Sequence, residues 1–268
     1  MTTDAAKAGQ VSGSAAEIYD EFFVPALFGA WAEPLCTSAG LKSGQSVLDV
    51  ACGTGATTRV AETFVQPGGA ATGLDRNDDM LSVARSKHTS IDWRSGMAEA
   101  LPFDDATFDV VLCQFGLMFF EDRQVALKEM RRVVRPGGTI AASVWDKAEH
   151  SPGYDAMIRL IDDLFGKDPA DALRAPFVLG EIEALEKALS DGGMSGASIV
   201  TQHGTARFPS IEEWARLDVR GWTLSEFFDD ASFEKLLTHA REKLAKFAGP
   251  DGTVTFAAPV HIAVWSSE

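Results

Sequence analysis

Cysteine is scarce in this chain of 268 residues, and no apolar run is long enough to cross a membrane. The three cysteines, Cys36, Cys52 and Cys113, are scattered and form no CxxC pair. Zinc sites and disulfide frameworks need paired cysteines, so we expect neither, and no metal. The longest apolar stretch, residues 108–120, is shorter than the roughly 20 residues of a membrane span. The N-terminal residues contain no apolar core of a secretory signal. These absences predict a reduced, cytoplasmic protein.

Basic residues are also in deficit. The chain has 24 Lys and Arg against 39 Asp and Glu, a formal net charge of −15. A surface this acidic repels phosphate backbones and anionic membranes, so we expect no nucleic-acid partner and no stable insertion into a membrane. Hydrophobic residues make up 46% of the chain and charged residues 24%, which is the mixture of a folded globular protein. The partner that we expect is a small molecule, and a homodimer stays open.

Short apolar strands alternate with helical patterns over residues 46–145. The helices run over 56–65 and from two capping residues, Asn77 and Asp122. This alternation predicts an α/β fold with a doubly wound, mostly parallel sheet. Such sheets bind ligands at the carboxyl ends of their strands, beside the first strand. The strands are predicted at 46–52, 71–75, 91–95, 107–115 and 139–145.

Outside this core the pattern is mostly helical. Residues 14–35 predict an N-terminal helical stretch that Pro25 divides into two pieces. The turn RPGG, residues 135–138, ends the helix that begins at Asp122. Beyond Trp145 we predict helices at 153–165, 179–190, 210–222 and 231–247, and strands at 197–203 and 260–265.

The loop after the first strand carries the strongest motif. The segment LDVACGTG, residues 48–55, places Gly53 and Gly55 where the backbone turns sharply and a ligand can approach closely. Asp49 stands just inside the strand end. Asp75 ends the second strand, where a carboxylate binds the hydroxyls of a ribose in this architecture. Together these features indicate a nucleoside cofactor.

Two classes of nucleoside cofactor compete for this loop. A loop that binds a dinucleotide usually has the pattern GxGxxG, and Thr58 stands in the place of its third glycine. Asp49 would also place negative charge near the phosphates of a dinucleotide. A cofactor with a positive sulfonium and an amino group tolerates that charge, so the residues favour the second class.

Five blocks of sequence carry a resemblance to a known family, in the family's order and at its spacing over residues 45–145. They are LDVACGTG (48–55), GLDRNDDML (73–81), AEALPF (98–103), FDVVLCQFGLMFF (108–120) and LKEMRRVVRPGGTI (127–140). The chain is similar to the class I S-adenosylmethionine-dependent methyltransferases, and within them to the small-molecule branch of ubiquinone/menaquinone-type methyltransferases. The resemblance implies a seven-stranded Rossmann-like sheet and S-adenosylmethionine as cofactor. It also implies methyl transfer to a small, apolar or aromatic metabolite, by C- or O-methylation.

The resemblance implies roles for individual residues. Asp49 and the glycine loop would hold the methionine moiety, Asp75 would bind the ribose, and Met80 would pack beside the adenine. Met97 departs from the family pattern, because relatives often carry an acidic residue there. The full set implied for cofactor binding is Tyr19, Asp49, Ala51, Gly53, Gly55, Asp75, Arg76, Met80, Met97, Ala98, Glu99, Gln114 and Phe115.

The acceptor side is less clearly marked. His150, just after the fifth predicted strand, is placed to act as a catalytic base at the mouth of the cleft, and a solvated loop histidine is the other interpretation. Trp145, Trp214 and Trp222 fall on rim or lid segments and would suit an apolar or aromatic acceptor, although large aromatic residues usually lie in the core. No (N/D)PPY block or Pro-Cys pair follows the fourth strand, which argues against nucleic-acid methylation.

We predict a single methyltransferase domain over residues 1–268. Two other functions stay open, an NAD(P)-dependent oxidoreductase and a non-catalytic S-adenosylmethionine-binding homologue, since no obligatory catalytic side chain is identifiable. The predicted parts of the domain are N-terminal helices at 1–38, a cofactor-binding core at 45–145, a helical lid inserted at 205–250 and a C-terminal strand region at 252–266.

Overall fold

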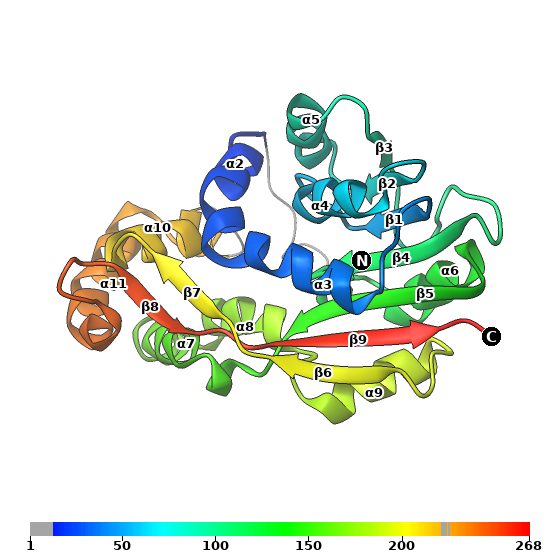
Figure 1. Ribbon diagram of the computed structural model, residues 1–268. Coiled ribbons are helices and arrows are strands. Elements are labelled where there is room, and N and C mark those ends of the chain that lie inside the picture. The colour runs from blue at the N-terminus through cyan, green and yellow to red at the C-terminus, as the bar shows by residue number, and fades with distance from the viewer. Residues whose placement is uncertain (1–12, 221–223, 225) are drawn as a thin grey trace.

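The computed structural model describes residues 13–220, 224 and 226–268. Within these residues, the main sheet has seven strands in the order β3-β2-β1-β4-β5-β9-β6 (Figure 1). All of them run parallel except β9, which is antiparallel to both of its neighbours. The predicted doubly wound α/β fold is therefore confirmed. The strands are β1 (Ser46–Val50), β2 (Ala70–Asp75), β3 (Asp92–Ser95), β4 (Phe108–Gln114), β5 (Val134–Trp145), β6 (Ser198–Gln202) and β9 (Val260–Ser266).

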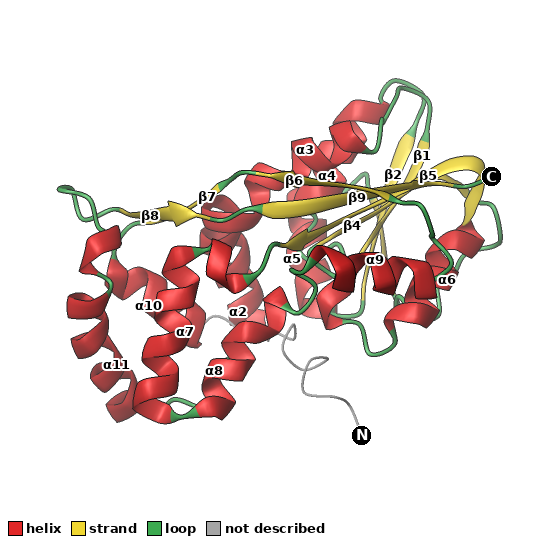
Figure 2. Cartoon of the chain, turned by 90° about the horizontal axis from the view of Figure 1, so that it is seen from below, coloured by secondary structure: helices red, strands yellow, loops and turns green. Residues whose placement is uncertain are grey.

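Helices cover both faces of this sheet (Figure 2). On one face, α3 and α4 pack against each other, and α6 and α9 pack together on the other. The parallel strands are buried on both sides for this reason, which explains why they are nearly continuous apolar runs in the sequence. The bounds are α3 (Ala32–Ser38), α4 (Ala56–Val65), α5 (Asp78–Lys87), α6 (Arg123–Val133) and α9 (Ile182–Asp191).

Helices α5 and α6 begin at the capping residues that the sequence predicts. Oδ1 of Asn77 accepts hydrogen bonds from the backbone N–H groups of Asp79 (2.9 Å) and Met80 (3.3 Å). Oδ1 of Asp122 accepts one from the N–H of Val125 (3.0 Å). These bonds satisfy donors that the first turn of a helix leaves unpaired. The cap of α5 also fixes the position of Met80 relative to the end of β2.

The N-terminal helical stretch is continuous, so the prediction that Pro25 divides it is wrong. α2 (Gly13–Ile18) leads directly into a π-helix, η1 (Tyr19–Phe28), and a short 3₁₀ turn, η2 (Gly29–Trp31), joins it to α3. Pro25 lies inside the π-helical stretch. Proline disrupts the ordinary i→i−4 pattern because it lacks an N–H and its ring strikes the carbonyl four residues earlier. The wider winding of a π-helix changes that register, and the chain continues.

The turn RPGG is a bulge within β5 and not a boundary before it. β5 starts at Val134, five residues earlier than the predicted strand. Phe108 pairs with Val134 and Val110 pairs with Thr139, so the residues between them on β5 bulge out of the ladder. Gly137 has a φ of 76° there, a left-handed conformation that glycine adopts at little cost.

The rest of the chain forms a helical group beyond one end of the sheet (Figures 1 and 2). α7 contacts both α8 and α11, and α10 contacts α11. A two-stranded antiparallel ribbon of β7 and β8 connects this group to the sheet. The sequence did not predict α8 or β7. The bounds are α7 (Pro152–Phe165), α8 (Lys167–Arg174), β7 (Thr205–Phe208), α10 (Ile211–Arg220), α11 (Asp230–Lys243) and β8 (Val254–Ala257).

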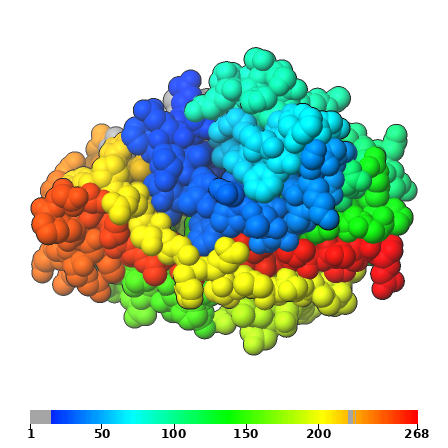
Figure 3. Space-filling model, in the orientation of Figure 1, coloured from blue at the N-terminus to red at the C-terminus, as the bar shows by residue number. Residues whose placement is uncertain are grey.

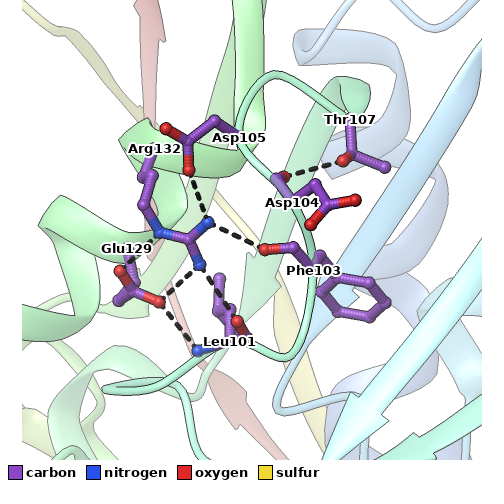
Figure 4. Close-up of polar contacts among 7 residues, drawn as sticks. All are labelled: Leu101, Phe103, Asp104, Asp105, Thr107, Glu129 and Arg132. Atoms are coloured by element: carbon purple, nitrogen blue, oxygen red, sulfur yellow. Dashed lines mark hydrogen bonds and ion pairs between the residues drawn. The ribbon is translucent and has the colours of Figure 1, made fainter.

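A hydrogen-bond network anchors the loop between β3 and β4 (Figure 4). The guanidinium of Arg132, on α6, donates to the carbonyl oxygens of Leu101 (3.0 Å) and Phe103 (2.7 Å). It also bonds the carboxylates of Glu129 and Asp105. Glu129 in turn accepts from the N–H of Leu101 (2.9 Å). A single arginine therefore holds the loop that carries the predicted adenine-binding residues.

Candidate functional site

A cleft lies at the carboxyl ends of β1, β2, β4 and β5. This is the place at which a doubly wound sheet binds ligands. The structure brings most of the predicted site residues together there. Those that line the cleft are Tyr19, Ala51, Gly53, Asp75, Arg76, Met80, Ala98, Glu99, Gln114, Phe115 and Trp145. Lining residues that the sequence did not predict are Phe28, Leu74, Gly116, Phe119 and Phe120.

The floor of the cleft is made by two strand ends in an unusual backbone conformation. Ala51, after β1, and Phe115, after β4, have φ values of 59° and 53°. A left-handed conformation is costly for residues with a side chain, and such residues cluster at functional sites. A Cβ added at Gly116 would lie 2.7 Å from the Cβ of Ala51. The two loops therefore meet closely, and Phe115 lines the cleft beside them.

Asp75 joins the end of β2 to the glycine loop. One carboxylate oxygen accepts the N–H of Gly53 (2.8 Å) and the other accepts the N–H of Asn77 (2.9 Å). Burial raises the pKa of Asp75, and the two backbone hydrogen bonds oppose that rise. Each carboxylate oxygen can accept a second hydrogen bond. Asp75 can therefore hold the loop and bind a pair of ligand hydroxyls at once.

A smaller recess beside the cleft contains three buried oxygen atoms with no hydrogen-bond partner among the described residues. They are Oδ1 of Asp49, Oγ1 of Thr54 and Oε1 of Gln114. The recess shares Tyr19 with the main cleft. Unpaired polar atoms in such a place are costly and point to a missing partner. A ligand with several N–H donors, such as an ammonium group, would satisfy them.

The other oxygen of Asp49 is already bound. Oγ1 of Thr58 donates to Oδ2 of Asp49 at 2.6 Å, inside the core. Burial raises the pKa of Asp49 to about 7, and the bond from Thr58 opposes this rise. The side-chain amide of Gln114 is fixed as well, because its Nε2 donates to the carbonyl of Phe28 (3.1 Å). Both side chains are thus positioned before a ligand arrives.

One end of the cleft is lined by four aromatic rings, Tyr19, Phe28, Phe115 and Trp145, which we call the ring-lined end. Phe115 and Trp145 stack with their centroids 4.2 Å apart. Phe28 contacts both rings, at 5.5 and 5.9 Å, and Tyr19 stacks on Phe28 at 5.2 Å. Aromatic faces attract cations and pack well against flat apolar ligands. This end of the cleft can therefore accept both a cationic centre and an apolar group.

Comparison with known proteins identifies the core of the chain. Residues 48–142 match a family described as "Methyltransferase domain". These residues form a methyltransferase domain. The demethylmenaquinone methyltransferase of Staphylococcus aureus is 41% identical over 113 residues, which are 41% of this chain and 47% of that protein. The match thus spans about half the length of this curated relative.

Solved structures share the methyltransferase fold over most of the chain. The YcgJ protein of Bacillus subtilis covers 89% of this chain, with 98% of its own length, a TM-score of 0.61 and 19% identity. A SAM-dependent methyltransferase from Aquifex aeolicus covers 71% of this chain, with 91% of its own length, a TM-score of 0.54 and 21% identity. The family match confirms the prediction of a methyltransferase domain in the core of the chain, and the solved structures confirm the predicted fold.

Two predicted cofactor residues of the methyltransferase domain line neither the cleft nor the recess. Gly55 has a φ of 80°, and a Cβ there would lie 2.2 Å from the ring of Trp93. Its role is to let the glycine loop pack against Trp93. Met97 is 39% exposed and forms an isolated backbone bridge with Ala100. Neither Gly55 nor Met97 belongs to the site that the other residues form.

The predicted acceptor residues are scattered. His150 is half exposed, with Nδ1 2.7 Å from Oδ2 of Asp146, and it does not line the cleft. Trp214 is fully buried between Phe208 and Phe256, so its assignment to the acceptor site is corrected. A large apolar ring is stabilised more by such burial than by a place on a rim. Trp222 lies outside the described residues. Among His150, Trp145 and Trp214, which the structure describes, Trp145 lines the cleft.

Proposed function

We propose that this chain transfers the methyl group of S-adenosylmethionine to a small, apolar or aromatic metabolite, by C- or O-methylation. The observation that carries the proposal is that two features adjoin, one in the recess and one in the cleft. Unpaired buried oxygen atoms, which need a donor-rich cation, lie directly beside the ring-lined end. A cofactor with an ammonium group, a sulfonium and a nucleoside needs this combination.

The residues present fit that cofactor group by group. Oδ1 of Asp49 and Oε1 of Gln114 would accept hydrogen bonds from the ammonium, since neither has a hydrogen-bond partner among the residues that the structure describes. Asp75 would bind the ribose hydroxyls through the free lone pairs of its carboxylate. Met80 and Ala98, which line the same cleft as Asp75, would enclose the adenine.

The chemistry of the bound cofactor is a methyl group on a positive sulfur, ready for in-line displacement. The chain's contribution is to align the acceptor with that methyl group and to exclude water. The faces of Phe115 and Trp145 would stabilise the positive charge and hold a flat acceptor. These rings are buried and stacked, so their position is fixed in advance.

The acceptor that suits this site carries its own acidic hydroxyl group. Burial and the nearby carboxylates of Asp75, Asp20 and Asp49 raise the pKa of Tyr19 far above its usual range, so its phenol keeps its proton. His150 does not face the cleft, and no step is assigned to it. A phenol has a pKa near 10, so at neutral pH a small fraction of such an acceptor is present as the nucleophilic phenolate. The curated relative named above acts on demethylmenaquinone, which belongs to the quinones, and reduced quinones are phenols of this kind.

Calorimetric titration tests the cofactor assignment. S-adenosylhomocysteine should bind saturably, and Asp75→Ala should abolish that binding, whereas Asp92→Ala, which removes an exposed carboxylate on β3, should not change it. Binding of NAD(H) or NADP(H) instead would overturn the proposal. Activity is then followed as S-adenosylhomocysteine formed with a panel of reduced quinones and phenols. No turnover with any of them, despite tight cofactor binding, would favour a non-catalytic homologue.

Two further properties rest on the composition. We propose a cytoplasmic location, which the acidic charge and the sparse, unpaired cysteines support. Among the described residues, none of the helices is both long and apolar enough to cross a membrane. A homodimer stays a prediction, as does the absence of a nucleic-acid partner.

A further inference from the structure

The two edges of the main sheet differ in how they are protected. β3 forms one edge and carries the exposed ion pair of Asp92 and Arg94. β6 forms the other edge, at the lower margin of the sheet in Figure 1, and among the described residues it pairs with β9 alone. An edge strand leaves a row of N–H and C=O groups unpaired, and proteins guard such rows with charges, prolines or bulges. The ion pair on β3 is a guard of this kind.

β6 carries none of these guards. Its five residues, SIVTQ, include no charge and no proline, and they pair with β9 in an unbroken register. The longer stretch 192–206 contains no Asp, Glu, Lys or Arg. Val200, at the centre of β6, is 55% exposed, and in Figure 3 the yellow part of the chain, which includes β6, reaches the surface beside the red atoms of β9. An uncharged, partly apolar edge of this kind is a template for a further strand.

A surface groove adjoins the same edge. Gln202, the last residue of β6, lines this groove together with Pro34 of α3 and with Val60 and Phe64 of α4. Pairing of a five-residue strand by itself buries less than the roughly 800 Å² per partner that is usual in a stable interface. The groove adds contact area next to the strand. The face that a partner can cover is therefore larger than the edge of β6.

Charge and symmetry point to a second copy of this chain as the occupant. Two copies with a net charge of −15 repel each other wherever acidic surfaces meet, and the edge of β6 lets them approach without charged side chains between them. An antiparallel pair of identical strands is also self-complementary about a twofold axis. Pairing of β6 with β3 of a further copy would build an open chain of molecules, and the charges of Asp92 and Arg94 disfavour it.

We propose that two copies of this chain associate through β6, antiparallel about a twofold axis, so that their seven-stranded sheets join into one continuous sheet. Val200 of each copy lies within this contact. The cofactor cleft is lined from the ends of β1, β2, β4 and β5 and not from β6, so it stays open in the dimer. The dimer does not depend on the identity of the methyl acceptor.

Sedimentation equilibrium of the full chain tests the dimer. We expect a dissociation constant of roughly 10 μM for the unmodified protein. Val200→Lys should raise that constant at least about tenfold, because it places two like charges within the contact. Val178→Lys is the matched control and should leave the constant unchanged, since Val178 is also an exposed valine, at 51%, and lies outside the stretch 192–206. Circular dichroism of both variants checks that each is folded.

Hydrogen exchange and salt dependence identify the surface that associates. The backbone amides of residues 198–202 should exchange more slowly as the protein concentration rises through the dissociation constant, and Val200→Lys should remove this concentration dependence. Added salt should strengthen the dimer, because it screens the repulsion between two acidic copies, whereas it would weaken an interface built from ion pairs. A protein that stays monomeric at roughly ten times the expected dissociation constant overturns the proposal. A dimer that Val200→Lys leaves intact does so as well.

Discussion

The hydroxyl of Thr58 donates a 2.6 Å hydrogen bond to one oxygen of Asp49, and the second oxygen of that carboxylate is buried without a partner in the described part of the chain. Thr58 occupies the place of the third glycine in a dinucleotide-binding loop. In this chain the position has a different use, because the threonine orients a carboxylate toward the recess. The same residue thus argues against a pyrophosphate ligand and in favour of a cationic one.

Asp49→Asn should weaken the binding of S-adenosylhomocysteine by roughly thirtyfold, about 2 kcal/mol, the size of a hydrogen bond to a charged group. The amide keeps the shape of the side chain and removes its charge, so the fold should persist. Calorimetry gives the affinity, and Asp92→Asn is the control for a lost surface carboxylate. Equal affinities in Asp49→Asn and the unmodified protein would show that the ammonium binds elsewhere.

The affinity for S-adenosylhomocysteine should depend on pH around neutrality. Burial raises the pKa of Asp49 to about 7, so below that pH the carboxyl is increasingly protonated in the free protein. Binding of an ammonium needs the ionised form, and the proton must leave at a cost that grows as pH falls. We expect affinity to weaken several-fold from pH 7.5 to pH 6. Asp75 also has a raised pKa, so the pH profile of Asp49→Asn, which should be flatter, assigns the effect.

The first half of the fold could be predicted because its signals are local. Buried parallel strands are short, uninterrupted apolar runs, and Asn77 and Asp122 mark two helix starts by capping chemistry. Asp49 and Asp75 could be placed in the site for a similar reason. Both residues lie at or just inside the carboxyl end of a predicted strand. The topology of a parallel sheet brings these strand ends together, so the two side chains could be expected at the same site.

Other features depend on contacts that no local pattern contains. Trp145 ends a predicted strand and Trp214 lies in a predicted helix, and neither local pattern shows that the first lines the cleft and the second is a core residue. Phe28 lines the cleft because the π-helical winding of η1 carries it there, past Pro25. A proline ordinarily signals a break, so the sequence pattern favoured the wrong geometry for this segment.

Arg132→Met should destabilise the protein and loosen the adenine side of the cleft. The change removes the donors to the carbonyls of Leu101 and Phe103 and leaves Glu129 without its cation (Figure 4). We expect a loss of about 2 kcal/mol in the free energy of unfolding, measured by denaturant titration. Lys128→Met, on the exposed side of the same helix, should lose much less. Arg132→Lys should restore only part of the loss, since an ammonium cannot reproduce the fork of the guanidinium.

Gly55→Ala separates backbone strain from steric exclusion at the end of the glycine loop. Gly55 has a φ of +80°, and an added Cβ would lie 2.2 Å from the ring of Trp93. Gly40 has a similar φ of +67° with nothing within 4 Å of such a Cβ. Gly40→Ala should therefore cost only the left-handed conformation, about 1 kcal/mol. Gly55→Ala adds displacement of Trp93 and should cost at least about 2 kcal/mol more. Equal losses in denaturant titrations of the two variants would mean that Trp93 moves freely and does not support the loop.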